Sequence, residues 1–147
     1  MTREDLKNYK YNQEWIKDRQ LYIEEYRASI EKITGTLSDM PKASKSVEDG
    51  MAEKIATLID IVNELTTKIV QVAKKQQEIL NQVDLVEQPY RTILDKVYIQ
   101  GKSLVKVASE MDYSYRDLCR KHGIALNKFD ENKSCPILSL NGTYKVC

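Results

Sequence analysis

The chain has 147 residues, of which 31% are charged, and 23 Lys or Arg side chains nearly balance 22 Asp or Glu side chains. Aromatic residues make up only 7%, and there are just five Gly and three Pro residues. This composition disfavours a large globular core and predicts one small domain, or one domain with an appendage, built from long amphipathic helices.

The N-terminal sequence MTREDLKNYKYNQ is polar, and no segment approaches the roughly 18 apolar residues of a membrane span. We therefore expect a cytoplasmic protein that does not enter a membrane. Cys119, Cys135 and Cys147 lack CxxC spacing, which predicts reduced thiols. Because the sequence contains no glycine-rich phosphate loop and no cluster of metal ligands, we expect no enzyme activity, cofactor or metal.

Two apolar stripes at helical spacing predict two long helices. In the second, from Glu48 to Val86, the spacing alternates strictly between four and three residues, as in a heptad repeat. Its positions are Met51, Ile55, Leu58, Val62, Leu65, Ile69, Val72, Gln76, Ile79 and Val83. The first stripe predicts a helix from about Glu4 to Ile33, with apolar positions at Leu6, Tyr9, Ile16, Ile23, Tyr26, Ile30 and Ile33.

Residues 35–47 are predicted to link the two helices, since Gly35, Pro41 and small polar residues are expected to stop both. The helices can then fold back as an antiparallel hairpin. Ile59, Val70 and Leu80 widen the second stripe, so we expect a second copy of the chain to cover it. The alternative is a monomer in which the C-terminal residues supply the third surface.

A separate unit is predicted to follow Pro89, which is expected to end the long helix. Tyr90, Ile93, Leu94 and Val97 form the apolar face of its first helix, and Gly101 is placed for a left-handed cap. Ser103 is expected to cap a second helix, in which Leu104, Val107, Ala108 and Met111 point the same way.

Ser114 to Asp117 has the form of a capping box and is expected to start a third helix. Helical geometry turns Leu118, His122 and Ala125 inward and Arg116, Arg120 and Asn127 outward. His122 is expected to be a core or cap histidine. A metal site made with Cys119 and Cys135 is the remote alternative.

This pair of helices meets the requirements of a DNA-reading helix-turn-helix, namely a small residue at the crossing, Ala108, and a protruding second helix. Residues 90–129 carry eight basic and four acidic side chains, whereas residues 1–34 carry seven of each. We expect Tyr115, Arg116 and Arg120 to read bases and Lys102, Lys106 and Lys121 to contact phosphates, with Ser103 and Ser114 at the helix starts. The alternative is a three-helix module whose surface is basic for other reasons.

The run ILDKVYIQGKSLVKVASEMDYSYRDLCRKHGIALNKF resembles the fourth-region, promoter-reading module of bacterial sigma factors. The segments LKNYKYNQEWI, ITGTLSDMPKAS and KIATLIDIVNEL extend the resemblance to small phage-encoded sigma-like regulators related to the RinA and ArpU late-transcription activators. The resemblance implies a protein that binds DNA upstream of phage late genes and activates their transcription with host RNA polymerase. That family usually has glycine where this chain has Asp112, which implies an unfavourable backbone angle for Asp.

The expected fold is therefore all-α: a helical hairpin or coiled coil over residues 1–88, a helix-turn-helix module over 89–129 and an extended or flexible tail over 130–147. The expected function is a non-catalytic transcription regulator that binds double-stranded DNA as a homodimer in the bacterial cytoplasm. Two alternatives remain. One is a phage DNA-packaging subunit similar to a small terminase; the other is a coiled-coil interaction protein with Met40, Pro41 and Lys42 or the apolar run 137–140 as a contact surface.

Overall fold

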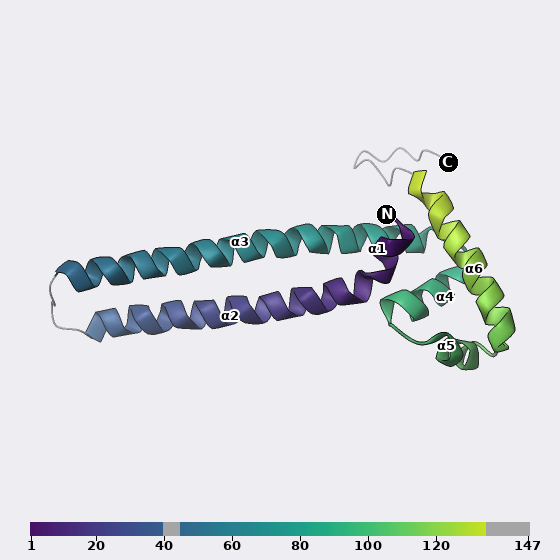
Figure 1. Ribbon diagram of the computed structural model, residues 1–147, viewed down its shortest axis with the longest axis horizontal. Helices are drawn as coiled ribbons and strands as arrows, with labels where there is room; N and C mark the ends of the chain where they lie inside the picture. The colour runs from purple at the N-terminus through teal and green to yellow at the C-terminus, as the bar shows by residue number, and fades with distance from the viewer. Residues whose placement is uncertain (40–44, 135–147) are drawn as a thin grey trace. The chain divides into compact units, whose positions relative to one another are not determined.

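The computed structural model describes residues 1–39 and 45–134, and every regular element in these ranges is helical (Figure 1). The all-α prediction is therefore confirmed. In chain order the elements are α1 (Arg3–Lys7), α2 (Tyr9–Asp39), α3 (Lys45–Asp84), α4 (Tyr90–Leu94), a π-helical turn (Asp95–Ile99), α5 (Leu104–Glu110), α6 (Tyr115–Glu131) and a 3-10 turn (Asn132–Ser134).

The chain divides into two compact units, and their boundaries differ from the predicted ones. One unit is Glu14–Ala73, the main part of the hairpin. The other combines Met1–Gln13 with the chain from Lys74 onward, so it contains α1 and the end of α3 as well as the predicted helix-turn-helix. A boundary at residue 88 is not observed, because buried residues on both sides of it share one core.

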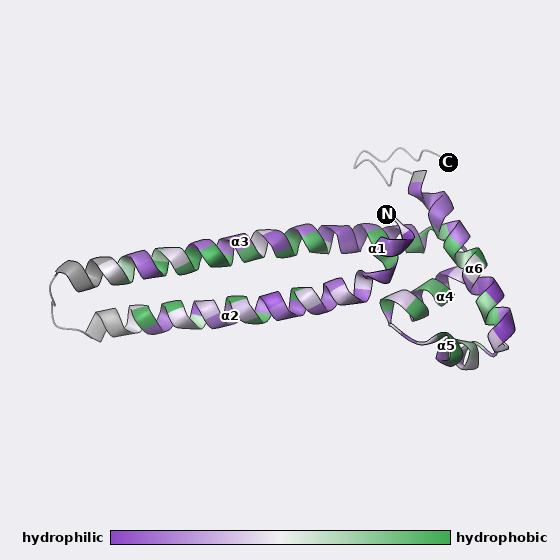
Figure 2. Ribbon diagram, in the orientation of Figure 1, coloured by the Kyte–Doolittle hydropathy of each residue, from purple (hydrophilic) through white to green (hydrophobic). Residues whose placement is uncertain are grey.

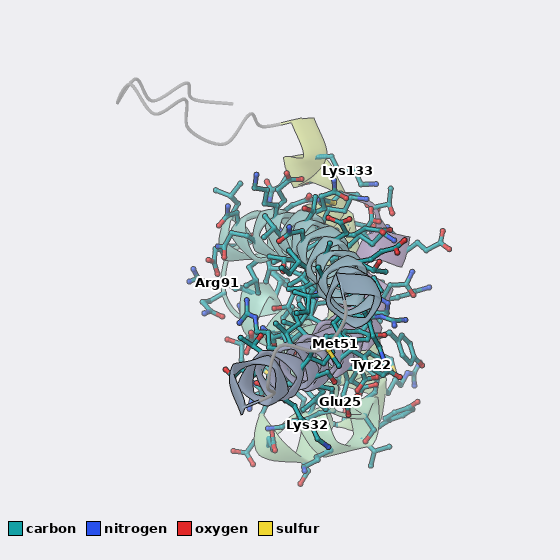
Figure 3. All side chains as sticks on the ribbon, turned by 90° about the vertical axis from the view of Figure 1, so that its left-hand side faces the viewer. Tyr22, Glu25, Lys32, Met51, Arg91 and Lys133 are labelled. Atoms are coloured by element: carbon teal, nitrogen blue, oxygen red, sulfur yellow. The ribbon has the colours of Figure 1, made fainter. Side chains whose placement is uncertain are left out.

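In the hairpin unit, α2 and α3 run side by side in opposite directions (Figure 1). Apolar residues recur along α3 with polar residues between them (Figure 2), and every predicted stripe position from Ile16 to Ile33 and from Met51 to Val72 is buried or half-buried. In the view along the helices, Met51 lies between them, while Glu25 points from α2 away from α3 (Figure 3). The predicted pairing of the two stripes is therefore confirmed.

Both long helices are longer than predicted at the ends that flank the linker. α2 continues through Gly35 to Asp39, and α3 begins at Lys45, within the predicted linker. A single glycine weakens a helix by only about 1 kcal/mol relative to alanine, which is too little to stop one that is packed along its length. Met40, Pro41 and Lys42, the proposed contact surface, lie outside the described residues.

Near the N-terminus, the predicted continuous helix is interrupted at Asn8. The Thr2 hydroxyl accepts a hydrogen bond from the Asp5 backbone N–H, and the Asp5 carboxylate accepts one from the Thr2 backbone N–H, which makes α1 a separately capped turn. This capped turn brings the side chain of Leu6 into the core of its unit, where it is fully buried.

The core around α1 joins three distant parts of the sequence. Its buried members are Leu6, Tyr9, Ile79, Val83, Val86, Leu94, Ala125 and Phe129. Two glutamines of α3 complete it with hydrogen bonds to backbone carbonyls: Gln76 donates to Tyr9 at 2.8 Å and Gln82 donates to Phe129 at 2.7 Å. At its edge, the Arg3 side chain pairs with the Asp130 carboxylate and donates to Asn127 at 2.7 Å. These contacts tie α1 and α3 to the C-terminal half of α6.

A second, smaller core lies under the helix-turn-helix. Ile93, Val107, Ala108 and Leu118 are buried in it, and Val97, Leu104, Met111 and Tyr113 pack against it. The predicted inward faces of all three helices are therefore confirmed, with Ala108 in the α5 face that meets α6. The first helix differs in one respect, because it passes into a π-helical turn at Asp95 that no sequence signal predicted.

Two backbone positions with positive φ shape this part of the fold. Gly101 has a φ of +70°, as its predicted role as a left-handed cap requires. Asp112 has a φ of +58° in the turn between α5 and α6, which confirms the unfavourable angle expected there. At the other end of α6, residues 130–134 are helical and not part of an extended tail; residues 135–147 lie outside the described residues.

Candidate nucleic-acid interface

Serine caps fix where the two helices of the candidate interface begin. The Ser103 hydroxyl accepts a hydrogen bond from the Lys106 backbone N–H at 3.3 Å, and the Ser114 hydroxyl accepts one from the Asp117 backbone N–H at 3.2 Å. Each serine thereby satisfies one N–H that has no partner inside its helix. Both predicted helix starts are confirmed.

The helix α6 has one buried and one exposed face. Leu118, Ala125 and Phe129 are fully buried, while Arg116, Arg120 and Tyr115 are exposed. The side chain of Arg120 is 64% exposed and Tyr115 is 55% exposed. The first turns of α6 therefore present an aromatic and basic ridge on the side away from the core, as the sequence predicted.

His122 lies at the edge of the buried face, and its Nε2 is 2.8 Å from the hydroxyl of Tyr98. Burial, and to a lesser extent the charges of Lys7 and Arg3, hold the pKa of His122 below its ordinary value. His122 is therefore half-buried and hydrogen-bonded within the protein, as expected of a core or cap histidine. Among the described residues, no group of three or more His, Cys, Asp or Glu could hold a metal ion, and Cys135 lies outside them.

Two of the three lysines predicted to contact phosphates form ion pairs with carboxylates of the protein itself. The Glu110 carboxylate binds Lys102 at 2.9 Å and Lys96 at 2.8 Å, and these hydrogen bonds lower the pKa of Glu110 to about 2. Lys121 is only 19% exposed and lies 5.1 Å from the centre of the Tyr113 ring. Lys106 is the exposed member of the predicted set. Lys102 and Lys121 therefore have carboxylate partners within the protein, and their contacts with phosphates stay a prediction.

The basic surplus of residues 90–129 is reduced by internal pairing. Five of the eight basic side chains in that range contact a carboxylate: Lys96, Lys102, Arg120, Lys121 and Lys128. Exposed pairs of this kind add little stability, but they lower the positive potential toward a ligand. Of the other three, Arg91 of α4 donates to the Asp84 backbone carbonyl, so the usable charge of α5 and α6 is concentrated on Arg116, Lys106 and the outer side of Arg120.

Three residues outside the set predicted to contact DNA also belong to this surface. Asp117 accepts a hydrogen bond from Arg120 at 2.9 Å. Cys119 lies one helical turn from Tyr115, and its interaction with the Tyr115 hydroxyl raises the pKa of that group. Val105 is an apolar side chain that α5 leaves largely exposed. The i,i+3 and i,i+4 spacings could have revealed the first two, because such residues are neighbours on a helix.

None of the helices in the described part of the chain combines the length and apolarity needed to cross a membrane. Comparisons with curated proteins and with solved structures give no match. A family model matches residues 38–130, which include α3, the helix-turn-helix and nearly all of α6. The chain therefore belongs to the family described as "Protein of unknown function (DUF1492)".

Proposed function

We propose that this protein binds double-stranded DNA sequence-specifically and regulates transcription without catalysing a reaction, with α6 as its recognition helix. The observation that carries the proposal is the ridge of Tyr115, Arg116 and Arg120 on the first turns of α6, opposite the buried Leu118. A recognition helix contacts base edges with its N-terminal residues, and here that end is both capped and uncovered.

The side chains of the ridge have the chemistry for reading bases. An arginine guanidinium bonds the O6 and N7 acceptors of guanine together, which makes Arg116 and Arg120 the proposed base-reading residues. Lys106 and the serines at the helix starts, Ser103 and Ser114, are placed for phosphate contacts that set the register of the helix. Lys102 and Lys121 act mainly within the protein in this proposal, because their ammonium groups contact carboxylates.

The resemblance to phage sigma-like regulators supports a more specific role. On that basis the protein would activate phage late genes together with host RNA polymerase in the bacterial cytoplasm. We propose that it acts as a homodimer, because Ile59 and Val70 of α3 are 43% and 46% exposed although they flank the heptad stripe. A second copy packed along the hairpin unit would cover both.

Selection of DNA fragments by the purified protein tests this function. Genomic fragments are captured at two salt concentrations, because phosphate contacts alone weaken steeply as salt rises. We expect one recurrent site upstream of a transcription unit to persist at the higher concentration. Uniform capture that is lost with salt would refute sequence-specific regulation.

Substitutions then locate the reading face. Arg116→Ala and Arg120→Ala should each weaken binding to the recovered site by about tenfold or more, since a bidentate guanine contact contributes about 1–3 kcal/mol. Arg27→Ala, which removes the same charge from an exposed position of α2, serves as the matched control. Normal binding by both α6 variants would show that the assigned face is wrong. A sedimentation mass of about eight or more copies would instead favour the DNA-packaging alternative.

A further inference from the structure

We infer that Asp117 is a positioning residue that holds the guanidinium of Arg120 in the orientation needed to read a guanine. This inference rests on the proposed function and assigns to an acidic residue a part of the sequence specificity. The relevant contact is the 2.9 Å hydrogen bond from an Arg120 terminal nitrogen to Asp117 Oδ1, on the exposed ridge of α6.

Asp117 has one further contact through its backbone and one through its carboxylate. Its backbone N–H donates to the Ser114 hydroxyl at 3.2 Å, so it belongs to the capped first turn of α6. Its second oxygen, Oδ2, is 3.8 Å from the ammonium of Lys121. That ammonium also lies 5.1 Å from the centre of the Tyr113 ring, and Tyr113 packs against the core under the helix-turn-helix. A chain of contacts therefore leads from this core through Lys121 and Asp117 to Arg120.

The hydrogen bond to Asp117 leaves most of Arg120 available. A guanidinium has five N–H donors in a rigid plane, and this contact uses one terminal nitrogen. The Arg120 side chain remains 64% exposed while that of Asp117 is 36% exposed, so the arginine extends beyond the carboxylate toward solvent. Its remaining donors match the paired acceptors of guanine.

Restricting Arg120 before binding should increase discrimination between bases. An unrestrained arginine side chain samples many rotamers. It can also donate its hydrogen bonds to a nearby phosphate, and such a contact carries no sequence information. A guanidinium held by a carboxylate presents its plane in one orientation and is less free to turn toward a phosphate. The expected consequence is a stronger preference for guanine at one position, and not a general gain in affinity.

The test compares wild type, Asp117→Asn, Arg120→Ala and the double variant on the recovered DNA site. The base pair read by Arg120 is identified first, as the position whose preference disappears in Arg120→Ala. Each protein is then titrated with the site carrying each of the four bases at that position. Thermal unfolding of every variant, followed by circular dichroism, checks that α6 remains folded.

We expect wild type to prefer guanine by about tenfold. Asp117→Asn should reduce this preference to about threefold or less, whereas it should have no further effect in the Arg120→Ala background, as two residues acting through one contact require. A merely structural role of Asp117 would instead weaken binding to all four sites equally.

Three outcomes would overturn the inference, and they can be told apart. If Asp117→Asn keeps the full guanine preference, the carboxylate does not orient Arg120. If it alters base preference even without Arg120, Asp117 contacts a base itself. If wild type shows no base preference at any position, the proposed function fails together with the inference.

Discussion

The hydroxyl of Tyr98 lies 2.8 Å from Nε2 of His122, and the two rings stack with their centroids 5.7 Å apart and their planes inclined by 25°. This pair joins the π-helical turn to the middle of α6. Burial raises the pKa of Tyr98 and lowers the pKa of His122, so the neutral form of both side chains is favoured in the folded protein.

His122 should make the protein less stable as the pH falls. Because its folded pKa is below the ordinary value of 6.5, the unfolded chain takes up a proton first. The free energy of unfolding should therefore decrease as pH falls from 6.5 to the folded pKa, and should not change through this residue above 6.5. Urea unfolding between pH 7.5 and 5 measures the effect, and His122→Gln should reduce the slope. An identical slope in the variant would contradict the assignment.

Glu110 should act in a lower pH window. Its pKa falls from 4.5 to about 2 in the folded protein through hydrogen bonds to Lys96 and Lys102. The stability it contributes should be complete above pH 4.5 and should be lost as the pH falls toward 2. Comparing the pH dependence of unfolding for wild type and Glu110→Gln isolates this contribution. Glu78→Gln, an exposed substitution on α3, is the control, and the prediction fails if both variants behave alike.

Two glycine substitutions should change stability in opposite directions. Gly123→Ala lies in α6, where an added Cβ would meet nothing within 4 Å, so it should stabilise the fold by about 0.5–1 kcal/mol. Gly101→Ala places an L-residue at a φ of +70° with Lys10 side-chain atoms in the way, and should destabilise by about 1–2 kcal/mol. Thermal melts of both variants provide the measurement. If Gly101→Ala were more stable than wild type, the backbone at this position would have to leave the left-handed conformation without cost.

The N-terminal turn should be needed for the stability of the unit that contains α4, α5 and α6. Leu6 is fully buried in the core that contains Phe129, so Leu6→Ala should lower the free energy of unfolding by about 2–5 kcal/mol. Tyr11→Ala should change it by no more than about 0.5 kcal/mol, because Tyr11 is 71% exposed. Urea unfolding monitored by circular dichroism separates the two. Equal effects would contradict the placement of α1 in this core.

Charges placed on the flanks of the heptad stripe should prevent self-association. The double substitution of Ile59→Lys and Val70→Lys should convert the proposed dimer to a monomer, because the apolar contact would bury two unpaired charges. Gln71→Lys, at an exposed polar position, should leave the mass unchanged. Sedimentation equilibrium gives the masses. A wild-type mass of one chain would exclude the dimer directly.

The features of the fold that depend on local sequence patterns were predictable from the sequence. The heptad stripe located the buried side of α3, and the serines at 103 and 114 located the starts of α5 and α6. These features depend on residues close together in the chain, such as a hydroxyl and an N–H three positions later. The left-handed cap at Gly101 was predictable for the same reason.

Contacts between distant segments were not predictable in this way. Nothing in the local pattern around Arg3 indicates that it pairs with Asp130, or that Gln82 donates to the Phe129 carbonyl. For the same reason the core extends across the predicted boundary at residue 88, because Pro89 lies in the short connection between α3 and α4 and not at the edge of a core. Likewise, Glu110 is 8 and 14 positions from the lysines it binds, spacings that no single helix brings together.

The Arg3 and Asp130 pair spans 127 positions, which has a consequence for how the protein is made. During translation α1 is synthesised first. The residues of α6 that cover its apolar Leu6 side chain are among the last described residues to be synthesised. The core shared by α1 and α6 can therefore form only after the ribosome has translated both arms of the hairpin. An mRNA truncated before Phe129 would yield a chain whose first turn has no core to join.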